Sequence, residues 1–469
     1  MLRALLFLIK VGVLVAAAVW IADRQGSVVI GWDDYRITVQ TGFFLFGAIA
    51  VILLAIFIYR LIQLITSLPR TLRRTRALRR QAAGYKALAS GLAAVAAGDT
   101  RAAIKAAERA HKFLPADQGL PLLLQAQAAR LQGREEQAQT MFQQLTHHKQ
   151  AGFLGVRGLL QAAMDRRDYE RALDLARQAL RLHPQQGWII KLVYDLEIRQ
   201  QEWDAALVTL GRALKAGVIS SNQVTRDRGA LYVAQAECAQ AAGAGDQARG
   251  FLRMALKADP GFVPATLLLA KLYAEAGQSR AAIKVLEHGW RAQPHPDLAS
   301  LWQGLQTSVK SGGLFSKPLT EPMARLAWAE RLVALSPQHP ESHLAAGIAA
   351  AAESLWGEAR DHFRKAEALE PSGRLYKHWI ALERRAGANP RVMEALQEKW
   401  DALIRQDRAE RRWVCRMSGR IYDQWMVLAP PHGAFNTIEW VFPGAQDIQP
   451  GVLSMGEPMP LTLSVAAGA

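Results

Sequence analysis

The sequence predicts an all-α protein in which two amino-terminal transmembrane helices precede a solenoid of stacked helix pairs. Three observations predict this class: two long apolar segments near the amino terminus, small residues that recur at a nearly fixed step, and prolines that close successive units. The chain has 469 residues and a formal charge of +16, and this length suits a membrane anchor with a repeat array better than one compact domain. Its two cysteines, Cys238 and Cys415, are too few for a disulfide framework.

The second apolar segment is the clearer of the two membrane spans. Residues 43–59 carry no charge, and after Arg60 further apolar residues extend to position 65. With this extension the segment is long enough to cross a hydrocarbon core of about 30 Å. The first segment, residues 2–22, contains Lys10, which costs roughly 2.5 to 3.5 kcal/mol at mid-bilayer, whereas each Leu, Ile, Phe or Val returns roughly 0.3 to 0.6 kcal/mol. Its many apolar residues offset the lysine, so insertion is favoured. A cleaved signal peptide, with residues 16–18 as the processing site, is the alternative.

A short loop, residues 23–41, separates the two spans. Apolar and β-branched residues at 28–32 and 36–39 flank Asp33 and Asp34, and this pattern indicates a small hairpin. Arg3 precedes the first span and an arginine cluster follows the second. The positive-inside rule therefore places both termini and the repeats in the cytoplasm, with residues 1–68 as a membrane anchor.

The arginine cluster lies in a segment, residues 69–97, that we expect to form a basic helix beside the membrane. Its members are Arg70, Arg73, Arg74, Arg76, Arg79 and Arg80. Each basic side chain near an anionic lipid surface contributes roughly 1 kcal/mol, and no nucleic-acid-binding motif accompanies the cluster. Anionic membrane lipid is therefore the expected partner, and nucleic acid is not.

Residues 98–406 carry the repeat signal. A small residue marks each unit, and these packing anchors are Ala103, Ala138, Ala172, Ala206, Ala248, Ala282 and Ala359. The first three steps are 35, 34 and 34 residues, which is the period of a two-helix tetratricopeptide (TPR) unit of about 34 residues. Small side chains let neighbouring helices approach closely, and a proline ends most second helices. One pair cannot bury its apolar face alone, so the pairs are expected to stack into a TPR-like α-solenoid.

The repeat register breaks twice. Ala206 and Ala248 lie 42 residues apart, and a longer gap separates Ala282 from Ala359. We assign the first excess to a polar loop near residues 218–224, before a helix that begins near Thr225, and the second to residues 311–318. Loops inserted in solenoids often lie on the binding face, but tolerated surface loops account for them equally well.

The repeats show no constellation that indicates catalysis. His147–His148 and the pair His339 and His343 are weak candidates for binding a metal or an iron porphyrin, because adjacent helical histidines point in different directions and His339 lies beside a proline in a turn. Trp203 and Trp356 occupy similar repeat positions, which favours a structural role for both. We therefore predict no catalytic residue, no cofactor and no enzymatic activity.

A different pattern begins after residue 406. Within residues 407–442, four positions match the two knuckles of a zinc ribbon, and they hold Cys415, Ser418, Ala429 and His432. Since only Cys415 and His432 have ligand side chains, and two ligands rarely hold structural zinc, we expect a degenerate ribbon without metal. Residues 443–469 are rich in Pro, Gly, Ala and Ser and are expected to be disordered.

The order of these parts resembles the HemY-type inner-membrane TPR proteins of proteobacteria. The resemblance covers both spans, the loop with Gly31-Trp32-Asp33-Asp34-Tyr35, the arginine run, the repeats and the segment from Trp413 to Trp440. It implies an inner-membrane location, a periplasmic loop at 23–41 and an association with late haem (porphyrin) biosynthesis. A TPR protein of lipopolysaccharide assembly, with one span and a similar carboxyl-terminal ribbon, is the nearest architectural alternative.

These observations predict a membrane-anchored scaffold whose concave surface binds other proteins, with haem-biosynthesis enzymes as the expected partners. Tethering acts by raising the effective concentration of the bound proteins. Two alternatives stay open: a regulatory adaptor for envelope assembly or proteolysis, and a direct haem or porphyrin carrier. The oligomeric state is left open as well.

Overall fold

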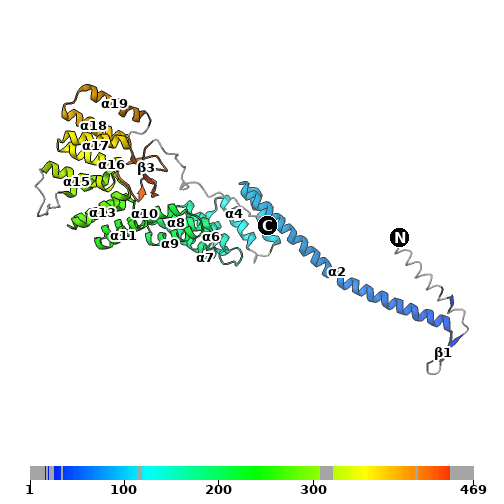
Figure 1. Cartoon of the computed structure of the whole chain (residues 1–469). Coiled ribbons are helices and arrows are strands. Elements are labelled where there is room, and N and C mark those ends of the chain that lie inside the picture. The colour runs from blue at the N-terminus through cyan, green and yellow to red at the C-terminus, as the bar shows by residue number, and fades with distance from the viewer. Residues whose placement is uncertain are drawn as a thin grey trace. The chain divides into compact units, whose positions relative to one another are not determined.

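The computed structural model describes residues 16, 19–20, 26–32, 35–114, 119–306, 321–406 and 410–443. The chain divides into two compact units, Met1–Ala138 and Gln139–Ala469. The first unit holds a hairpin, a long apolar helix and the first repeat helices. The second unit holds most of the repeat array and a small β ribbon (Figure 1).

The first unit begins with an antiparallel hairpin. Strand β1 (Ser27–Trp32) pairs with β2 (Tyr35–Gln40) along its whole length, from the Ser27–Gln40 pair to the Trp32–Tyr35 pair. This is the hairpin that the β-branched residues around Asp33 and Asp34 predict. Its second strand leads directly into helix α2 (Thr41–Ala96).

Helix α2 contains one candidate membrane span. The segment Gly42–Ile62 has 21 residues, a mean hydropathy of 2.7 and no buried part in its apolar window. At 1.5 Å per residue such a helix is about 32 Å long, which is enough to cross a bilayer core. The other predicted span, residues 2–22, lies almost entirely outside the described residues.

Helix α2 continues for 34 residues beyond this span and ends at Ala96. Its last turns join the packing of the repeats, because Ala87 and Ala94 are buried. The predicted division at residue 98 lies in the turn between α2 and α3, but the packing of the array already begins within α2. One uninterrupted helix includes the apolar segment, the basic segment and the first packing face of the array.

Two glycines allow this close packing of α2. A Cβ added at Gly84 would lie 2.6 Å from Leu114 Cγ, and one added at Gly91 would lie 2.5 Å from Leu124 Cδ2. Both distances are too short for a real contact. Small residues on this face of α2 therefore let α3 and α4 approach closely, as small residues do elsewhere in the array.

Helix pairs make up the rest of the array. The helices are α3 (Thr100–Phe113), α4 (Leu120–Leu131), α5 (Glu135–Leu145), α6 (Gly152–Asp165), α7 (Tyr169–Leu182), α8 (Gly187–Arg199), α9 (Trp203–Lys215), α10 (Ser221–Ala241), α11 (Gly245–Ala258), α12 (Val263–Glu275), α13 (Ser279–Ala292), α14 (Pro296–Leu305), α15 (Glu321–Leu335), α16 (Pro340–Ala352), α17 (Trp356–Leu369), α18 (Gly373–Ala386) and α19 (Pro390–Arg405). In the second unit, the even-numbered helix is the first of each pair and the odd-numbered helix that follows is the second.

The seven anchor alanines lie in the odd-numbered helices, and all are buried with at most 1% of their surface exposed. The residue four positions after an anchor is larger in several repeats, and Phe142 and Phe363 at this position fill the space beside a glycine of the facing helix. A Cβ added at Gly158 would lie 2.3 Å from Phe142 Cδ1, and one added at Gly347 would lie 2.5 Å from Phe363 Cδ1. Each phenylalanine ring therefore occupies the volume that a missing side chain leaves in the facing helix.

The first break in the register is a longer helix and not a loop. Helix α10 has 21 residues, against 13 in α8 and in α12, and this excess of two helical turns accounts for the 42-residue step. The expected loop near 218–224 is therefore corrected. Ser220 caps the helix, since its hydroxyl accepts the Gln223 amide hydrogen bond at 3.3 Å, so helix begins several residues before Thr225.

The second break hides a complete helix pair, α14 and α15. Position 325, which lies 34 residues before Ala359, holds Arg325 instead of a small residue, and its side chain is exposed and pairs with Glu353 at 2.6 Å. Ala329 and Leu332 of α15 are nevertheless buried. The predicted loop at 311–318 lies outside the described residues.

A small β ribbon follows the array. Strands β3 (Arg412–Cys415), β4 (Ile421–Tyr422) and β7 (Ile438–Val441) form a sheet in the order β4-β3-β7, and β5 (Leu428–Ala429) pairs with β6 (Ala434–Phe435). All neighbouring strands are antiparallel. We call residues 410–443 the ribbon. In Figure 1 it lies beside the even-numbered helices of the second unit.

Candidate functional site

The predicted knuckle positions lie in two similar turns of the ribbon. The Gly419 amide donates to the Cys415 carbonyl at 2.8 Å, and the Gly433 amide donates to the Ala429 carbonyl at 2.9 Å. Both glycines have left-handed backbone conformations, with φ of 67° and 63°. The turns therefore share the glycine-bearing geometry that the sequence indicates.

The side chains at these positions do not gather into a ligand set. Cys415 and Ala429 are buried, whereas His432 is exposed. Cys415 Sγ lies 3.3 Å from Thr437 Oγ1. Burial raises the pKa of the Cys415 thiol, but hydrogen bonds involving Ser418 and Thr437 lower it by more, so the net pKa is below its ordinary value. Among the described residues, no group of three or more His, Cys, Asp or Glu side chains is arranged to hold a metal.

The basic cluster lies on α2 beyond the apolar segment. The side chains of Arg76, Arg79 and Arg80 are exposed. Arg70, Arg73 and Arg74 are part of the same helix, but their side chains lie outside the described part of the chain. The three described arginines are thus accessible to an anionic surface.

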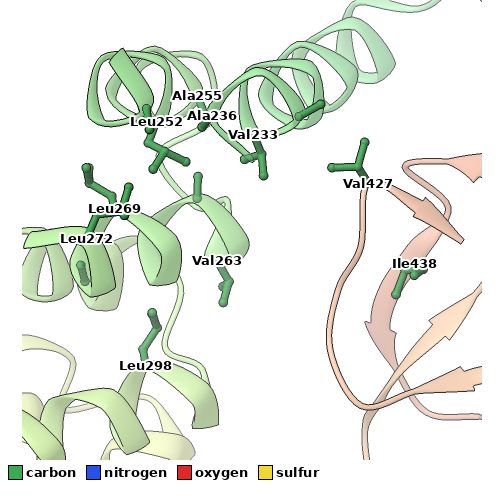
Figure 2. Packing of buried hydrophobic residues seen from close by; sticks show 14 of the residues in the cluster. Val233, Ala236, Leu252, Ala255, Val263, Leu269, Leu272, Leu298, Val427 and Ile438 are labelled. Atoms are coloured by element: carbon green, nitrogen blue, oxygen red, sulfur yellow. The ribbon is translucent and has the colours of Figure 1, made fainter. Parts of the chain in front are cut away.

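The ribbon packs against the array through an apolar interface. Val427 and Ile438 are buried in the same cluster as Val233 of α10 and Val263 of α12, and Figure 2 shows these ribbon and helix side chains on facing sides. The Phe435 ring also stacks on Trp203 at 6.4 Å between centroids. The ribbon and the array therefore share one hydrophobic core, which makes the ribbon a permanent part of the second unit.

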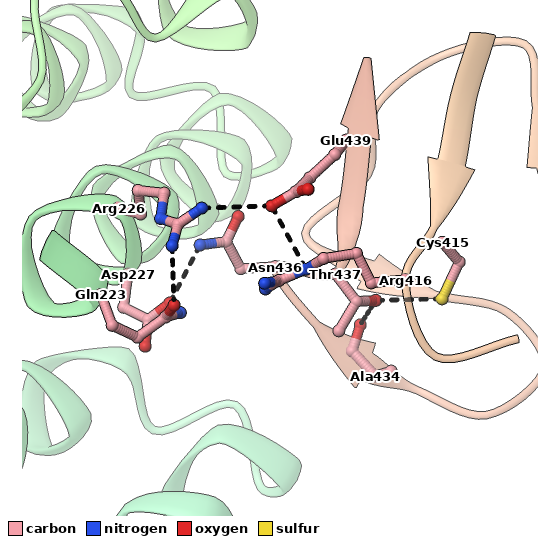
Figure 3. A network of polar contacts seen from close by, with 9 residues as sticks. All are labelled: Gln223, Arg226, Asp227, Cys415, Arg416, Ala434, Asn436, Thr437 and Glu439. Carbon is pink, nitrogen blue, oxygen red and sulfur yellow. Dashed lines mark hydrogen bonds and ion pairs between the residues drawn. The ribbon is translucent and has the colours of Figure 1, made fainter. Parts of the chain in front are cut away.

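A polar network surrounds this apolar contact (Figure 3). The Asn436 amide donates to Asp227 Oδ1 at 2.9 Å, and Gln223 and Tyr194 donate to the same carboxylate at 2.7 and 3.2 Å. Burial raises the pKa of Asp227, although these three hydrogen bonds oppose the shift. Glu439 lies 3.2 Å from both Arg226 and Arg416 at the more exposed edge.

The extra turns of α10 supply this polar network. Gln223, Arg226 and Asp227 all lie within the first two turns of the helix, which are the turns that α8 and α12 lack. The insertion that breaks the repeat register therefore builds the docking site for the ribbon. Sequence reasoning missed this role, because the excess was assigned to a loop near residues 218–224, before a helix that begins near Thr225.

A buried histidine marks the contact between the ribbon and α14. His295 is 1% exposed, and its ring lies 5.1 Å from Trp413 and 4.5 Å from Trp440. Its Nδ1 accepts the Asp297 amide hydrogen bond at 3.2 Å and so caps α14. Burial and the nearby positive charge of Arg374 lower the pKa of His295 to about 3. The histidine is therefore neutral at physiological pH.

The ribbon changes which surface is free for partners. The ribbon covers residues of α8, α10, α12 and α14 or of their caps, so these residues are not free to bind a partner. The aromatic side chains of the ribbon are the signal that would have indicated this contact. They are Trp413, Trp425, Phe435 and Trp440.

Two of the histidines proposed as porphyrin ligands, His339 and His343, have partners within the protein. His339 Nδ1 accepts the Glu341 amide hydrogen bond at 3.2 Å and caps α16. His343 Nδ1 lies 3.3 Å from His362 Nδ1, and His343 Nε2 lies 3.1 Å from the Pro337 carbonyl oxygen. These contacts occupy both ring nitrogens of His343. Its position in the sequence did not indicate them.

A small cavity lies where the ribbon meets α16 and α18. It encloses about 120 Å³, and Glu341, Arg374, Glu370 and Arg411 are among the residues that line it. Glu341 pairs with Arg374, and Arg411 pairs with Glu370 at 3.0 Å. Because the charges are paired with one another, the cavity joins the ribbon to the array and is not an open ion site.

Comparison with known proteins identifies the parts of the chain. Residues 26–133 match the family model described as "HemY protein N-terminus", and residues 236–306 match a tetratricopeptide repeat model. The chain therefore combines a HemY amino-terminal domain with tetratricopeptide repeats, as HemY-type TPR proteins do. The HemY match includes the hairpin, the apolar helix and the first repeat helices, and the TPR match falls within the repeat array, from α10 to α14.

One relative matches this chain over nearly its whole length. The "Probable magnetosome protein Mms48" of Magnetospirillum gryphiswaldense is 26% identical over 463 residues, covering 94% of this chain and 93% of the relative. Among solved structures, MamA has 18% identity and a TM-score of 0.24, covering 36% of this chain and 96% of MamA. The Naa15/Naa10 complex bound to HypK-THB has 15% identity and a TM-score of 0.36, covering 69% of this chain and 51% of the matched chain.

Proposed function

We propose that this HemY-type protein is a membrane-anchored, non-enzymatic scaffold that binds other proteins through its repeats. The observation that carries the proposal is the union, in one chain, of the HemY amino-terminal domain with an apolar helix and a TPR array. Stacked helix pairs present extended surfaces for protein binding.

The location that we propose is the bacterial inner membrane, with two spans and with the repeats in the cytoplasm. The apolar segment Gly42–Ile62 supports one of these spans. The exposed Arg76, Arg79 and Arg80 support the orientation, because arginines that follow a span favour the cytoplasmic side. The same side chains are suited to contact anionic lipid headgroups.

The partners that we propose are enzymes of late haem biosynthesis. The match of residues 26–133 to the HemY family supports this choice. Holding such enzymes at one membrane site would raise their effective concentrations without any new catalytic group. A poorly soluble porphyrin could then pass between neighbouring active sites.

Crosslinking in intact membranes tests the proposal. The full chain, carrying an affinity tag, is crosslinked in living cells and purified, and its partners are identified by mass spectrometry. We expect enrichment of haem-biosynthesis enzymes over an equally tagged inner-membrane protein without repeats. Recovery of magnetosome-type membrane proteins alone would overturn the haem assignment. It would indicate partners of the kind that the name of the Mms48 relative suggests. Conversion of a porphyrin precursor by the purified chain would overturn the scaffold role itself.

A further inference from the structure

Three repeats carry an aromatic residue at the same place, three positions before the anchor alanine. The aromatic residues are Tyr169, Trp203 and Trp356, which open helices α7, α9 and α17. In two of the three, an arginine from the next even-numbered helix lies over the ring. Arg199 of α8 has its Cζ 3.8 Å from the Tyr169 ring centroid, and Arg385 of α18 has its Cζ 5.4 Å from that of Trp356.

Both arginines occupy the same position relative to the turn that follows. Arg199 lies two residues before Gln201, and Arg385 lies two residues before Gly387. Gln201 and Gly387 have left-handed backbone conformations, with φ of 57° and 69°. In both repeats, an arginine in the last turn of the next even-numbered helix therefore lies over the ring of the aromatic residue, as in a cation–π contact.

The third repeat lacks this arginine. Helix α10 is followed by the left-handed Gly243, with φ of 75°, and the residue two positions earlier is Ala241. An open pocket of about 520 Å³ lies here, and Trp203, Asp204, Gln235 and Phe251 are among the residues that line it. The pocket therefore occurs in the one aromatic repeat whose internal cation is missing.

The pocket contains two buried polar atoms without partners. Trp203 is 8% exposed and Gln235 is 6% exposed, and neither the Trp203 Nε1 hydrogen nor the Gln235 Oε1 acceptor finds a hydrogen-bond partner among the described residues. Leaving such groups unpaired costs about 1 to 3 kcal/mol each. A ligand that offers both an N–H donor and a carbonyl acceptor would recover this energy.

The charge of the pocket favours a cation. Glu202 and Asp204 supply carboxylates, and none of the described residues that line the pocket is Lys or Arg. Asp204 accepts a hydrogen bond from Gln235 Nε2, and Glu202 pairs with Arg177. The pocket is thus acidic, although the chain as a whole has a formal charge of +16.

We propose that the pocket beside Trp203 binds an arginine side chain of a partner protein, in the place that Arg199 and Arg385 occupy in the other two repeats. The guanidinium lies over the face of Trp203 opposite Phe435 and donates to Asp204 and Gln235 Oε1, and the Trp203 N–H donates to a backbone carbonyl of the partner. Arginine fits better than lysine, because its planar group both stacks on an indole and donates several hydrogen bonds. The proposal rests on the proposed protein-binding function, since it assigns a partner chemistry to one surface of the array.

A photoreactive peptide tests this assignment on the full chain in detergent micelles. The probe is a glycine- and serine-flanked peptide with one arginine beside a benzophenone group, and the matched probe has citrulline in place of arginine. We expect the arginine probe to label residues that line the pocket, such as Gln247, Cys238 or Phe251, and the citrulline probe to label them at least about tenfold less. Equal labelling by both probes, or labelling confined to other helices, would overturn the proposal.

Two variants sharpen the test. Ala241→Arg restores the internal cation, and Asp204→Asn removes the carboxylate, so each is expected to reduce pocket labelling about tenfold or more. Ala395→Arg is the charge-matched control, because Ala395 is exposed on α19 and does not line the pocket. Unchanged labelling in Ala241→Arg would overturn the proposal.

Peptide labelling and partner recovery, measured on the wild-type chain, separate this proposal from the scaffold function. If the pocket is not labelled but the wild-type chain still recovers haem-biosynthesis enzymes from membranes, the arginine pocket is wrong and the scaffold stands. If the pocket is labelled but those enzymes are not recovered, the pocket stands and the haem assignment fails.

Discussion

His295 shows at the scale of one residue how the fold sets a side chain's chemistry. It lies between two tryptophans of the ribbon and caps α14 with Nδ1. Its pKa is about 3 in the folded protein, whereas an unfolded histidine titrates near 6.5. Between these two values the unfolded chain binds a proton that the folded chain excludes. The stabilising contribution is therefore complete above about pH 6.5 and is lost as the pH falls.

The variant His295→Asn tests this coupling. Asparagine keeps a capping oxygen for the Asp297 amide but does not titrate. We expect the free energy of unfolding of the wild type to fall by about 1 kcal/mol more than that of the variant between pH 6 and pH 5. Urea titrations at the two pH values measure this difference. The other titrating groups, including Asp195 with its pKa raised by burial to about 7, are present in both proteins. Parallel pH profiles would contradict the assignment.

Three turns within helix pairs place a residue other than glycine in the left-handed region. Ser354 has a φ of 60°, whereas the corresponding turn at Gly277 has a φ of 72°. This conformation costs a residue with a Cβ roughly 1 to 2 kcal/mol. We expect Ser354→Gly to raise the free energy of unfolding by about 0.5 to 1 kcal/mol, after the greater entropy of an unfolded glycine is subtracted.

Ser354→Ala is the matched control, because alanine keeps the Cβ and removes only the hydroxyl. It should give no such gain in a urea titration, and Gly277→Ser should lose about 1 kcal/mol. A gain of equal size in Ser354→Ala would show that the hydroxyl, and not the backbone conformation, limits stability here.

At the scale of single residues, the sequence predicts buried positions that recur from repeat to repeat, but it does not predict contacts that occur only once. Small residues at a 34-residue step identify buried positions such as Ala206 and Ala359, because the same helix–helix contact recurs there. Arg325 hid one repeat, since a single departure from a small residue removes the signal. The partners of Trp203 and His295 come from segments far along the chain, so no local pattern encodes them.

At the scale of elements, helix α10 and the ribbon depend on each other. The first turns of α10 carry the buried Asp227, and the ribbon supplies Asn436 to it. Asn436 also has a left-handed φ of 51°, so glycine can replace it without backbone strain. We expect Asn436→Gly to lower the free energy of unfolding by about 1 to 2 kcal/mol, because a buried carboxylate loses a donor.

Glu439→Gln is the matched control at the same interface. Glu439 pairs with Arg226 and Arg416, whose side chains are 49% and 37% exposed, and exposed ion pairs contribute only about 0.2 to 1 kcal/mol. Urea titrations should therefore rank Asn436→Gly as the more destabilising variant. The reverse order would mean that the exposed ion pairs, and not the buried carboxylate, hold the ribbon in place.

The elements themselves were largely predictable, but their lengths and docking were not. The turn glycines and the 34-residue step predict helix pairs, and the knuckle spacing predicts two similar turns at Gly419 and Gly433. The excess before Ala248 could equally have been loop or helix. The excess is helical because its residues contact the ribbon at 410–443. The ribbon residues in these contacts lie about two hundred residues beyond α10 in the sequence.

At the scale of the whole molecule, α2 links the membrane segment to the array. It runs from Thr41 to Ala96 without interruption, so the predicted boundary between anchor and basic segment, at residue 68, falls inside one helix, and the predicted boundary at residue 98 falls just after it. Composition indicated the boundaries because hydropathy and charge change along the chain. Helical structure does not change with them, since apolar, basic and small residues can all continue a helix.

The orientation of α2 decides whether the array can meet cytoplasmic enzymes. Arginines follow the apolar segment, and under the positive-inside rule the proposed orientation puts residue 80 and the repeats in the cytoplasm. We expect alkaline phosphatase fused after Arg80 to be inactive, because this reporter needs export to fold, and a fluorescent protein at the same site to be active. A fusion after Asp34, in the loop between the two expected spans, should show the opposite pair of activities. If phosphatase fused after Arg80 were active, the repeats would face the periplasm, out of reach of cytoplasmic enzymes, and the proposed haem-enzyme partners would be excluded.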